Sequence, residues 1–235
     1  METSPKSKSE KQGQKETHSI VLVDDHPLLR SALRSILEKQ PDLKIIAETD
    51  NGEEAVRLAK ELAPDIIIMD ITMPGLNGLE ATRQIKALNP GIAILALTVH
   101  SDSEHILGIL EAGADGYLTK SVFGEEVIQA IRAIIAGETV LSTQVFKELF
   151  KHVIRNKAKQ VDLGSGDKLT SREYEILRLV TRGMSNKDIA QALNLSLPTV
   201  KSYLADVFSK LRVSSRTEAV ITGLRAGFLT LDDLG

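Results

Sequence analysis

The stretch that decides the fold is Ile66-Ile-Ile-Met-Asp70-Ile-Thr-Met-Pro-Gly-Leu-Asn-Gly78, in which an unbroken apolar run ends in a polar turn. A short, continuous apolar run of this kind is typical of a buried strand in a parallel sheet. Similar runs occur at residues 20–23, 45–47, 92–97 and 116–118. Five such strands that alternate with helical patterns predict an α/β fold with a doubly wound, five-stranded parallel sheet.

The rest of the chain divides around this sheet. Apolar side chains recur at helical spacing between the strands, at Leu29, Leu33, Ile36 and Leu37 and again at Val127, Ile131, Ile134 and Ile135. We predict a disordered leader over residues 1–18, the sheet domain over 19–141, and a connecting helix and linker over 142–167. Residues 168–235 have repeated helix-start signals and predict a second, all-helical domain of four helices.

The composition excludes several kinds of site. The chain has no cysteine, so it offers no disulfide, no thiolate metal site and no cysteine nucleophile. No stretch reaches the roughly eighteen apolar residues that a membrane-spanning helix needs, and the polar leader does not resemble a signal peptide. We therefore expect no membrane partner and a location in the cytoplasm.

Charge is divided unevenly between the two predicted domains. Residues 168–235 carry 10 Lys and Arg against 7 Asp and Glu, whereas residues 1–167 carry 19 against 25. An acidic domain followed by a basic one is consistent with a nucleic-acid partner for the second domain, although so small a difference also arises by chance.

Polar residues follow the predicted strands at what becomes one edge of the sheet. Asp24 and Asp25 follow the first strand, Asp70 the third, Thr98 the fourth and Lys120 the fifth. In doubly wound sheets, ligands bind outside the carboxyl ends of the strands. Carboxylates this close together repel one another unless a cation joins them, and an all-oxygen ligand set favours Mg²⁺ over zinc.

Such a site suits phosphoryl chemistry. Asp70 could act as the nucleophile of an acyl phosphate, with Mg²⁺ and Lys120 stabilising the transferring oxygens and Thr98 donating a hydrogen bond to the product. Taken singly, each residue also fits a simpler role, since an Asp after a strand often caps a helix and a lone Lys or Thr is usually solvated. Their convergence on one sheet edge is what favours a site.

Four motifs stand at the strand ends: Asp24-Asp25, Asp70-Ile-Thr-Met-Pro-Gly-Leu-Asn-Gly78, Leu97-Thr98 and Gly113-Ala-Asp-Gly-Tyr-Leu-Thr-Lys120. Through these motifs, residues 19–137 resemble the receiver domains of two-component response regulators, which have a flavodoxin-like fold. The resemblance implies that Asp70 is the phosphoacceptor, that Asp25 binds Mg²⁺ directly and Asp24 through water, and that the Thr72 carbonyl completes the metal ligands. It also implies that Lys120 pairs with the phosphoryl group and that Thr98 forms a switch couple with Tyr117.

Two other classes of protein fit less well. A phosphatase of the haloacid-dehalogenase type needs a second Asp two residues after the nucleophile, and that position is Thr72. A dinucleotide-binding domain needs a Gly-rich turn after the first strand, where this chain has Asp24-Asp25-His26-Pro27. Two carboxylates there would repel a pyrophosphate.

The second domain contains a helix pair suited to DNA. Residues 186–193 are predicted as a short helix, Asn194-Leu195 as a tight turn and residues 197–211 as a longer helix. Capping boxes are predicted at Thr170-Ser-Arg-Glu173 and Ser215-Arg-Thr-Glu218, and Ser185 precedes the short helix. By itself such a pair is only a packing motif.

The second domain contains four further motifs: Leu169-Thr-Ser-Arg-Glu173, Gly183-Met-Ser-Asn-Lys-Asp-Ile-Ala190, Thr199-Val-Lys201 and Lys210-Leu-Arg-Val-Ser-Ser-Arg-Thr-Glu-Ala219. Through these motifs, nearly all of residues 168–227 resemble the LuxR-type DNA-binding domain of NarL-like regulators. Basic residues are few on the presumed groove-facing side, and Tyr203 stands where relatives usually have His. The predicted DNA contacts are Lys187, Thr199, Lys201, Ser202, Ala205 and Arg216.

The last predicted helix, residues 216–226, has two readings. Ala219, Val220 and Gly223 lie on one side of it, and the resemblance implies dimerisation through them. Ordinary packing in the domain core explains the same pattern.

The whole sequence therefore predicts a regulator rather than an enzyme. We expect a sensor histidine kinase to phosphorylate Asp70 in the presence of Mg²⁺, and phosphorylation to control homodimerisation and binding to double-stranded DNA. At most, the protein would hydrolyse its own phosphate slowly. The alternative is an atypical regulator that binds DNA without phosphorylation.

Overall fold

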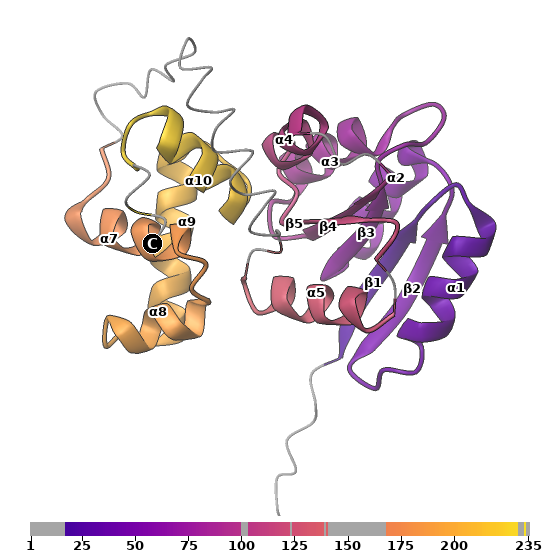
Figure 1. The fold of residues 1–235 in the computed structure, drawn as a ribbon, viewed down its shortest axis with the longest axis horizontal. Coiled ribbons are helices and arrows are strands. Elements are labelled where there is room, and N and C mark those ends of the chain that lie inside the picture. The colour runs from indigo at the N-terminus through magenta and orange to yellow at the C-terminus, as the bar shows by residue number, and fades with distance from the viewer. Residues whose placement is uncertain are drawn as a thin grey trace, which may run out of the picture.

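The computed structural model describes residues 17–99, 103–122, 124–138, 140, 168–229 and 233. The first of its two domains, the sheet domain, contains β1 (His18–Val23), β2 (Leu43–Thr49), β3 (Ile66–Asp70), β4 (Ala93–Thr98) and β5 (Gly116–Thr119). All neighbouring strands are parallel, and their order is β2-β1-β3-β4-β5 (Figure 1). The predicted doubly wound, five-stranded sheet is confirmed.

Helices cover both faces of this sheet (Figure 1). One face packs against α1 (Pro27–Leu37) and α5 (Glu125–Ile135), and the other against α2 (Gly52–Leu62), α3 (Gly78–Leu88) and α4 (Ser103–Glu111). Successive residues of β3 enter the two hydrophobic clusters in turn, Ile66 and Ile68 one of them and Ile67 and Met69 the other. Because both faces are buried, the strand reads as a continuous apolar run.

Some boundaries differ from the predictions. β1 begins at His18, one residue inside the predicted leader, and β2 extends two residues beyond the predicted run at each end. β2 is an edge strand with an exposed Lys44 and a half-buried Glu48. Because these polar residues flank its apolar run, the prediction from apolar residues was too short. Residues 1–16 and the predicted connecting helix and linker over 142–167 lie outside the described residues.

The helical domain consists of α7 (Ser171–Thr181), α8 (Asn186–Ala192), α9 (Leu197–Leu211) and α10 (Arg216–Arg225) within the described residues. Its hydrophobic cluster combines Ile176 of α7, Ile189 of α8 and Val200 of α9 with residues of α10. The predicted short helix, turn and long helix are therefore present. No helix in the described ranges is long and apolar enough to cross a membrane.

Side-chain caps fix where the helices of this domain begin. Thr170 and Glu173 form the predicted reciprocal capping box of α7. At α10 the prediction was half wrong: Ser215 accepts from the Glu218 N–H, but the Glu218 carboxylate accepts from the N–H and hydroxyl of Ser214 instead of the Ser215 N–H. The carboxylate thus secures the α9–α10 loop.

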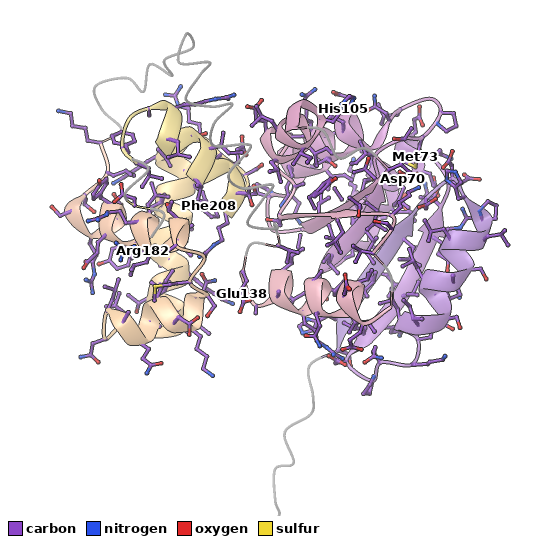
Figure 2. The ribbon with its side chains drawn as sticks, in the orientation of Figure 1. Asp70, Met73, His105, Glu138, Arg182 and Phe208 are labelled. Carbon is purple, nitrogen blue, oxygen red and sulfur yellow. The ribbon has the colours of Figure 1, made fainter. Side chains whose placement is uncertain are left out.

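The two domains pack against each other through α4 and α10 (Figure 1). Ile221 of α10 is 5% exposed and belongs to the hydrophobic cluster of the sheet domain. Arg225 of α10 forms an ion pair with Glu111 of α4. Phe208 and Glu138 lie on the sides of the domains that face each other (Figure 2).

Candidate functional site

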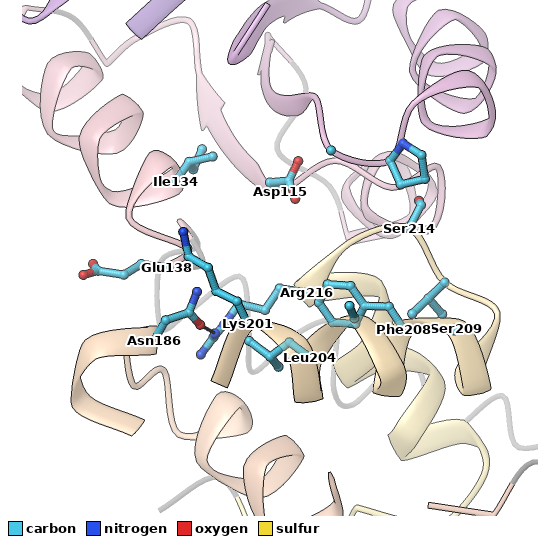
Figure 3. A pocket seen from close by; sticks show the side chains of 15 residues that line it. Asp115, Ile134, Glu138, Asn186, Lys201, Leu204, Phe208, Ser209, Ser214 and Arg216 are labelled. Atoms are coloured by element: carbon cyan, nitrogen blue, oxygen red, sulfur yellow. Dashed lines mark hydrogen bonds between the residues drawn. The ribbon is translucent and has the colours of Figure 1, made fainter. Parts of the chain in front are cut away.

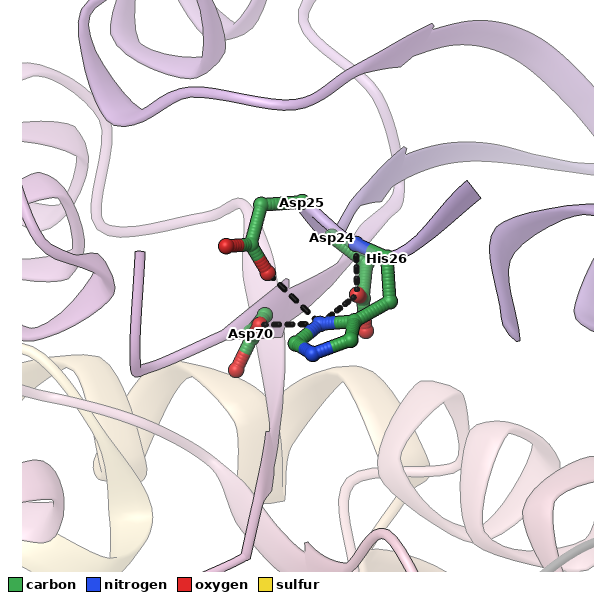
Figure 4. Close-up of side chains that lie close together, drawn as sticks. All are labelled: Asp24, Asp25, His26 and Asp70. Atoms are coloured by element: carbon green, nitrogen blue, oxygen red, sulfur yellow. Dashed lines mark hydrogen bonds and ion pairs between the residues drawn. The ribbon is translucent and has the colours of Figure 1, made fainter. Parts of the chain in front are cut away.

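Three carboxylates meet at the carboxyl ends of β1 and β3 (Figure 4). Asp24 and Asp25 directly follow β1, and Asp70 is the last residue of β3. One oxygen of each lies with a ring nitrogen of His26 in a group whose atoms are within 4.8 Å of one another. Asp70 is fully buried and Asp24 nearly so. The pairing of β1 with β3 thus brings together the three acids that the strand ends predicted.

Lys120 joins this acidic cluster from the end of β5. Its Nζ lies 2.6 Å from Asp70 Oδ2 and 2.9 Å from Asp24 Oδ2. The other Asp70 oxygen, Oδ1, accepts a 3.0 Å hydrogen bond from the Thr72 N–H. Charge-assisted hydrogen bonds are short and directional, so both Asp70 oxygens are held in fixed positions.

The glycine at the start of α3 allows this helix to approach Asp70. A Cβ added at Gly78 would lie 1.9 Å from the Asp70 backbone oxygen. Asn77 caps the helix by accepting a 2.9 Å hydrogen bond from the Glu80 N–H. The turn after β3 therefore needs glycine for packing, since any side chain would push α3 away from the acid.

Burial and neighbouring charges act in opposite directions at this site. The pKa of Asp70 lies above its usual value mainly because burial disfavours the charged form; hydrogen bonds from Lys120 and Thr72 oppose the rise, and the charge of Asp24 adds to it. Burial lowers the pKa of Lys120, but the neighbouring carboxylates of Asp70 and Asp24 outweigh this, so that pKa is raised overall. Lys120 stays positively charged beside two acids.

The donor atoms fit a magnesium ion. Asp24 Oδ2 and Asp25 Oδ1 are buried and make no hydrogen bond within the described part of the chain, although Lys120 and the His26 ring lie at ion-pair distance from them. Buried carboxylate oxygens in this state favour a cation that completes them. Carboxylate and carbonyl oxygens are the ligands that Mg²⁺ prefers.

His26 is the residue of this cluster that sequence reasoning missed. Its Nδ1 lies 2.7 Å from Asp25 Oδ1 and 3.2 Å from Asp24 Oδ1, and its side chain is 64% exposed. The available signal was its place directly after the Asp pair. A search confined to the first residues beyond each strand stops one position before it.

Thr98 and Tyr117 leave the sheet on the same face. Tyr117 pairs with Ala96 in the register of β4 and β5, and Thr98 is two residues beyond Ala96, so all three side chains point to one side. Thr98 is 1% exposed and Tyr117 5% exposed. A shared face is what a switch couple between them requires.

The long helix α9 presents its predicted DNA-binding side toward the sheet domain. Lys201, Ser202 and Ala205 are exposed on α9, and Lys187 is exposed on α8. Lys201 and Ala205 line a cavity that Glu138, just after α5, lines from the opposite side (Figure 3). Of these predicted contacts, Lys201 and Ala205 therefore face the sheet domain.

Two other predicted DNA contacts are engaged within the helical domain. Thr199 is half-buried and its N–H donates a 3.2 Å hydrogen bond to Ser196 Oγ at the start of α9. Arg216 is 6% exposed, and its guanidinium donates to Asn186 Oδ1 at 3.1 Å and to the Met184 carbonyl. Arg216 thus ties α10 to the start of α8, and its contact with DNA stays a prediction.

The three residues predicted for dimerisation lie in the interior of their own domain. Ala219 and Val220 belong to the hydrophobic cluster of the helical domain. A Cβ added at Gly223 would lie 2.9 Å from the Leu229 side chain. Their packing matches the alternative that the sequence left open, and a dimer contact through them stays a prediction.

Two family models match the chain. The model described as response regulator receiver domain matches residues 20–132. The model described as bacterial regulatory proteins, luxR family, matches residues 167–222. The first match covers most of the sheet domain and the second covers most of the helical domain.

Relatives share this organisation. The chain is 39% identical over 202 residues to the transcriptional regulatory protein LiaR of Bacillus subtilis (strain 168), covering 86% of this chain and 94% of that protein. It is 35% identical over 207 residues to the nitrate/nitrite response regulator protein NarL of Escherichia coli (strain K12), covering 88% and 94%. The crystal structure of a LuxR-family two-component response regulator from Aurantimonas sp. SI85-9A1 superimposes with a TM-score of 0.55 and 42% identity, covering 59% of this chain and 99% of that one. The chain therefore belongs to the two-component response regulators that join a receiver domain to a LuxR-type DNA-binding domain.

Proposed function

We propose that a sensor histidine kinase switches this DNA-binding transcription regulator by phosphorylating Asp70. The observation that carries the proposal is the buried Asp70 carboxylate, held between Lys120 and the Thr72 N–H beside two acids with oxygens that lack hydrogen bonds. The same chain carries a LuxR-type domain. We assign the protein to the cytoplasm because its proposed DNA partner is there.

The proposed transfer is a substitution at phosphorus. An Asp70 oxygen attacks the phosphorus of a phosphohistidine on the kinase, an O–P bond forms as the P–N bond breaks, and the leaving imidazole takes up a proton. The product is an acyl phosphate on Asp70. Asp24, Asp25 and the Thr72 carbonyl would hold Mg²⁺, which would supply positive charge to offset the repulsion between the acids and the phosphoryl group.

Lys120 is placed to stabilise that product. Its ammonium group already contacts Asp70 Oδ2, so it can transfer this interaction to a phosphoryl oxygen with little movement. We assign Thr98 and Tyr117, which share a sheet face, to the rearrangement that follows. The phosphoryl group stays on the chain itself, so slow hydrolysis of that group is the only turnover we assign to the protein.

The described arrangement suits a form that is not bound to DNA. A recognition helix must enter the major groove, which is about 12 Å wide, yet Lys201 and Ala205 face the receiver domain across a cavity. We propose that phosphorylation releases this packing and allows a homodimer to bind two half-sites. Lys187 and Ser202, which are exposed, then join Lys201 and Ala205 on the DNA, with Thr199 and Arg216 near the backbone.

Mass spectrometry after incubation with acetyl phosphate and Mg²⁺ tests the phosphoacceptor. The wild-type chain should gain the mass of one phosphoryl group, and Asp70→Asn should gain none, since it lacks the nucleophilic oxygen but nearly keeps the shape. Asp50→Asn is the matched control, because Asp50 is an exposed acid directly after β2. Labelling of Asp70→Asn to the wild-type extent would refute the assignment.

Gel shifts with labelled and unlabelled protein separate the proposal from its alternative. We expect phosphorylation to raise the affinity of the wild-type chain for DNA and to leave Asp70→Asn unchanged. Equal affinity of both forms would instead support a regulator that binds DNA without phosphorylation.

A further inference from the structure

A cavity of about 540 Å³ lies between the receiver and DNA-binding domains (Figure 3). The receiver contributes Pro90, Ile134 and Glu138, and the DNA-binding domain contributes one side of α9 and Arg216 of α10. Cavities of roughly 300–1,000 Å³ with mostly apolar walls are typical of small-molecule sites. The acidic cluster around Asp70 contributes none of the residues that line this cavity.

The two ends of the cavity differ in chemistry (Figure 3). The aromatic ring of Phe208 lies toward one end, beside Ser209. Lys201, Asn186 and Arg216 lie toward the other. A molecule that fills the space therefore meets an apolar wall at one end and cationic groups at the other.

Arg216 is a buried cation without full compensation. It is 6% exposed, and its Nε has no hydrogen-bond partner in the part of the chain that the structure describes. Its other contacts are the neutral oxygens of Asn186 and Met184. Burial lowers the pKa of Arg216 to about 10, against the raising effect of the Glu138 charge. A buried charge in such surroundings is unfavourable until a counter-ion approaches it.

The other nearby acid is already engaged. Asp115 accepts a 2.7 Å hydrogen bond from Lys86 and a 2.8 Å hydrogen bond from the Ile94 N–H through the same oxygen. Among the described residues that line the cavity, Glu138 is therefore the acid left to balance the positive charges of Lys201 and Arg216. This excess of positive charge favours the binding of an anion.

We propose that this cavity binds a small anionic molecule with an apolar body. Its carboxylate, sulfonate or phosphate group lies at the end with Lys201 and Arg216, and its body packs against Leu204 and Phe208. Because the molecule contacts both domains, it binds only while they are packed together and so favours that arrangement. The site is separate from the phosphoacceptor and does not depend on its chemistry.

Fluorescence titration of the full chain with anilinonaphthalene sulfonate and its uncharged parent, phenylnaphthylamine, tests the site. The two dyes share one apolar body and differ in the anionic group. We expect the sulfonate to saturate at one molecule per chain and to bind roughly fivefold or more tightly than the parent. Equal affinity for the two dyes would overturn the proposal that the site selects an anion.

Pairs of variants test whether the dye binds in this cavity. Ala205 and Ser202 are both exposed on α9, but only Ala205 lines the cavity, so Ala205→Leu should abolish saturable binding and Ser202→Leu should preserve it. Lys201→Gln should weaken binding roughly two- to fivefold, as expected for one exposed ion pair. Glu138→Gln should strengthen it, since it removes the opposing charge. Equal effects of the two leucine variants would show that the dye binds elsewhere.

Discussion

Asp24 and Asp25 are neighbours in sequence, but their carboxylates differ in burial and in the contacts that they make with the protein. Asp24 Oδ1 accepts a 2.8 Å hydrogen bond from the His26 N–H, and its Oδ2 contacts Lys120. The Asp25 side chain is 28% exposed against 3% for Asp24. Asp25 therefore keeps more lone pairs open to an added ion, which suits direct ligation.

We predict that Asp25→Ala weakens Mg²⁺ binding by about tenfold or more, because it removes a direct ligand, while Asp24→Ala, which loses a water-mediated contact, has a smaller effect. Labelling by acetyl phosphate should fall in the same order. Isothermal titration calorimetry with Mg²⁺ measures both variants. Undiminished Mg²⁺ affinity in Asp25→Ala would argue against direct ligation.

Glu173 links a helix cap to an ion pair in the DNA-binding domain. Its carboxylate accepts from the Thr170 N–H at 2.7 Å and from Lys210 Nζ at 2.7 Å. Burial raises the pKa of Glu173, but these hydrogen bonds outweigh it, so the pKa is lowered overall. A lowered carboxyl pKa stabilises the fold above the usual value for Glu, and that stability disappears as the pH falls through the lowered pKa.

We predict that Glu173→Gln destabilises the DNA-binding domain by about 1 kcal/mol at pH 7, as expected for a weakened cap. The difference from the wild type should shrink as the pH falls through the lowered pKa of Glu173, where Glu173 itself becomes neutral. Urea unfolding followed by circular dichroism measures both. Glu175→Gln is the control, since Glu175 pairs on the helix surface with Arg172. A difference that persists at low pH would rule out the charge as its cause.

Most of the acidic cluster could be predicted from the sequence, because the place of ligands at the carboxyl ends of parallel strands depends only on the sheet topology. In a parallel sheet the carboxyl ends of neighbouring strands meet, so Asp24, Asp70 and Lys120 can be brought together from sequence alone. The burial of Arg216 could not be predicted this way, because its partners lie far away in sequence, Met184 in the loop before α8 and Asn186 at the start of α8. Long-range side-chain contacts of that kind leave no periodic signal.

At the scale of elements, hydrophobic periodicity placed the buried strands and the helix pair, and it failed where burial is partial. β3 was predicted to within one residue because both its faces are covered. β2 was predicted too short because the exposed Lys44 and the half-buried Glu48 interrupt its apolar run near both ends. α8 begins with a complete capping box formed by Ser185 and Asp188. The prediction from the sequence included Ser185 but not Asp188.

Because α8 and α9 carry few cations, we expect each of these cations to contribute a large share of the DNA affinity. We predict that Lys187→Ala weakens binding to all DNA sequences and reduces the slope of log K against log salt by about one unit, as for one lost phosphate contact. Lys201→Ala should also reduce affinity, and a loss confined to particular base pairs would assign it to base readout. Gel-shift titrations at several salt concentrations measure these effects.

Lys60→Ala supplies the control for these titrations. Lys60 is exposed on α2 of the receiver domain, so its loss changes the net charge equally without touching the proposed DNA-binding face. If the salt slope falls by the same amount in all three variants, the effect reflects overall charge and the proposed surface is wrong.

At the scale of the whole molecule, two receiver glycines set how closely the domains approach. A Cβ added at Gly137 would lie 2.2 Å from Asn186 Nδ2, and one at Gly113 would lie 2.4 Å from Ser214 Oγ. Contacts of this size leave no room for a methyl group. The packing of the domains depends on these matches between distant segments, which is why the sequence predicted two domains but not their arrangement.

We predict that Gly137→Ala loosens the domain packing and raises the DNA affinity of the unphosphorylated protein roughly five- to tenfold, the effect of about 1 kcal/mol of overpacking. Gly124→Ala is the matched control, because Gly124 also has a positive φ, 70° against 83° for Gly137, but a Cβ there meets nothing within 4 Å. Gel shifts without phosphate donor compare the two. A similar rise in both variants would point to backbone strain instead of the contact with Asn186.

The burial of Ile221 of α10 in the hydrophobic cluster of the receiver domain indicates how much free energy holds the two domains together. Withdrawing one fully buried Ile from an apolar environment costs about 1.5–3 kcal/mol. Converting a two-state population from 1:99 to 99:1 takes about 5.5 kcal/mol. This one side chain thus supplies roughly a quarter to a half of the free energy that distinguishes a mostly packed ensemble from a mostly open one. Truncating Ile221 alone should therefore make the open form a measurable fraction of the molecules at rest.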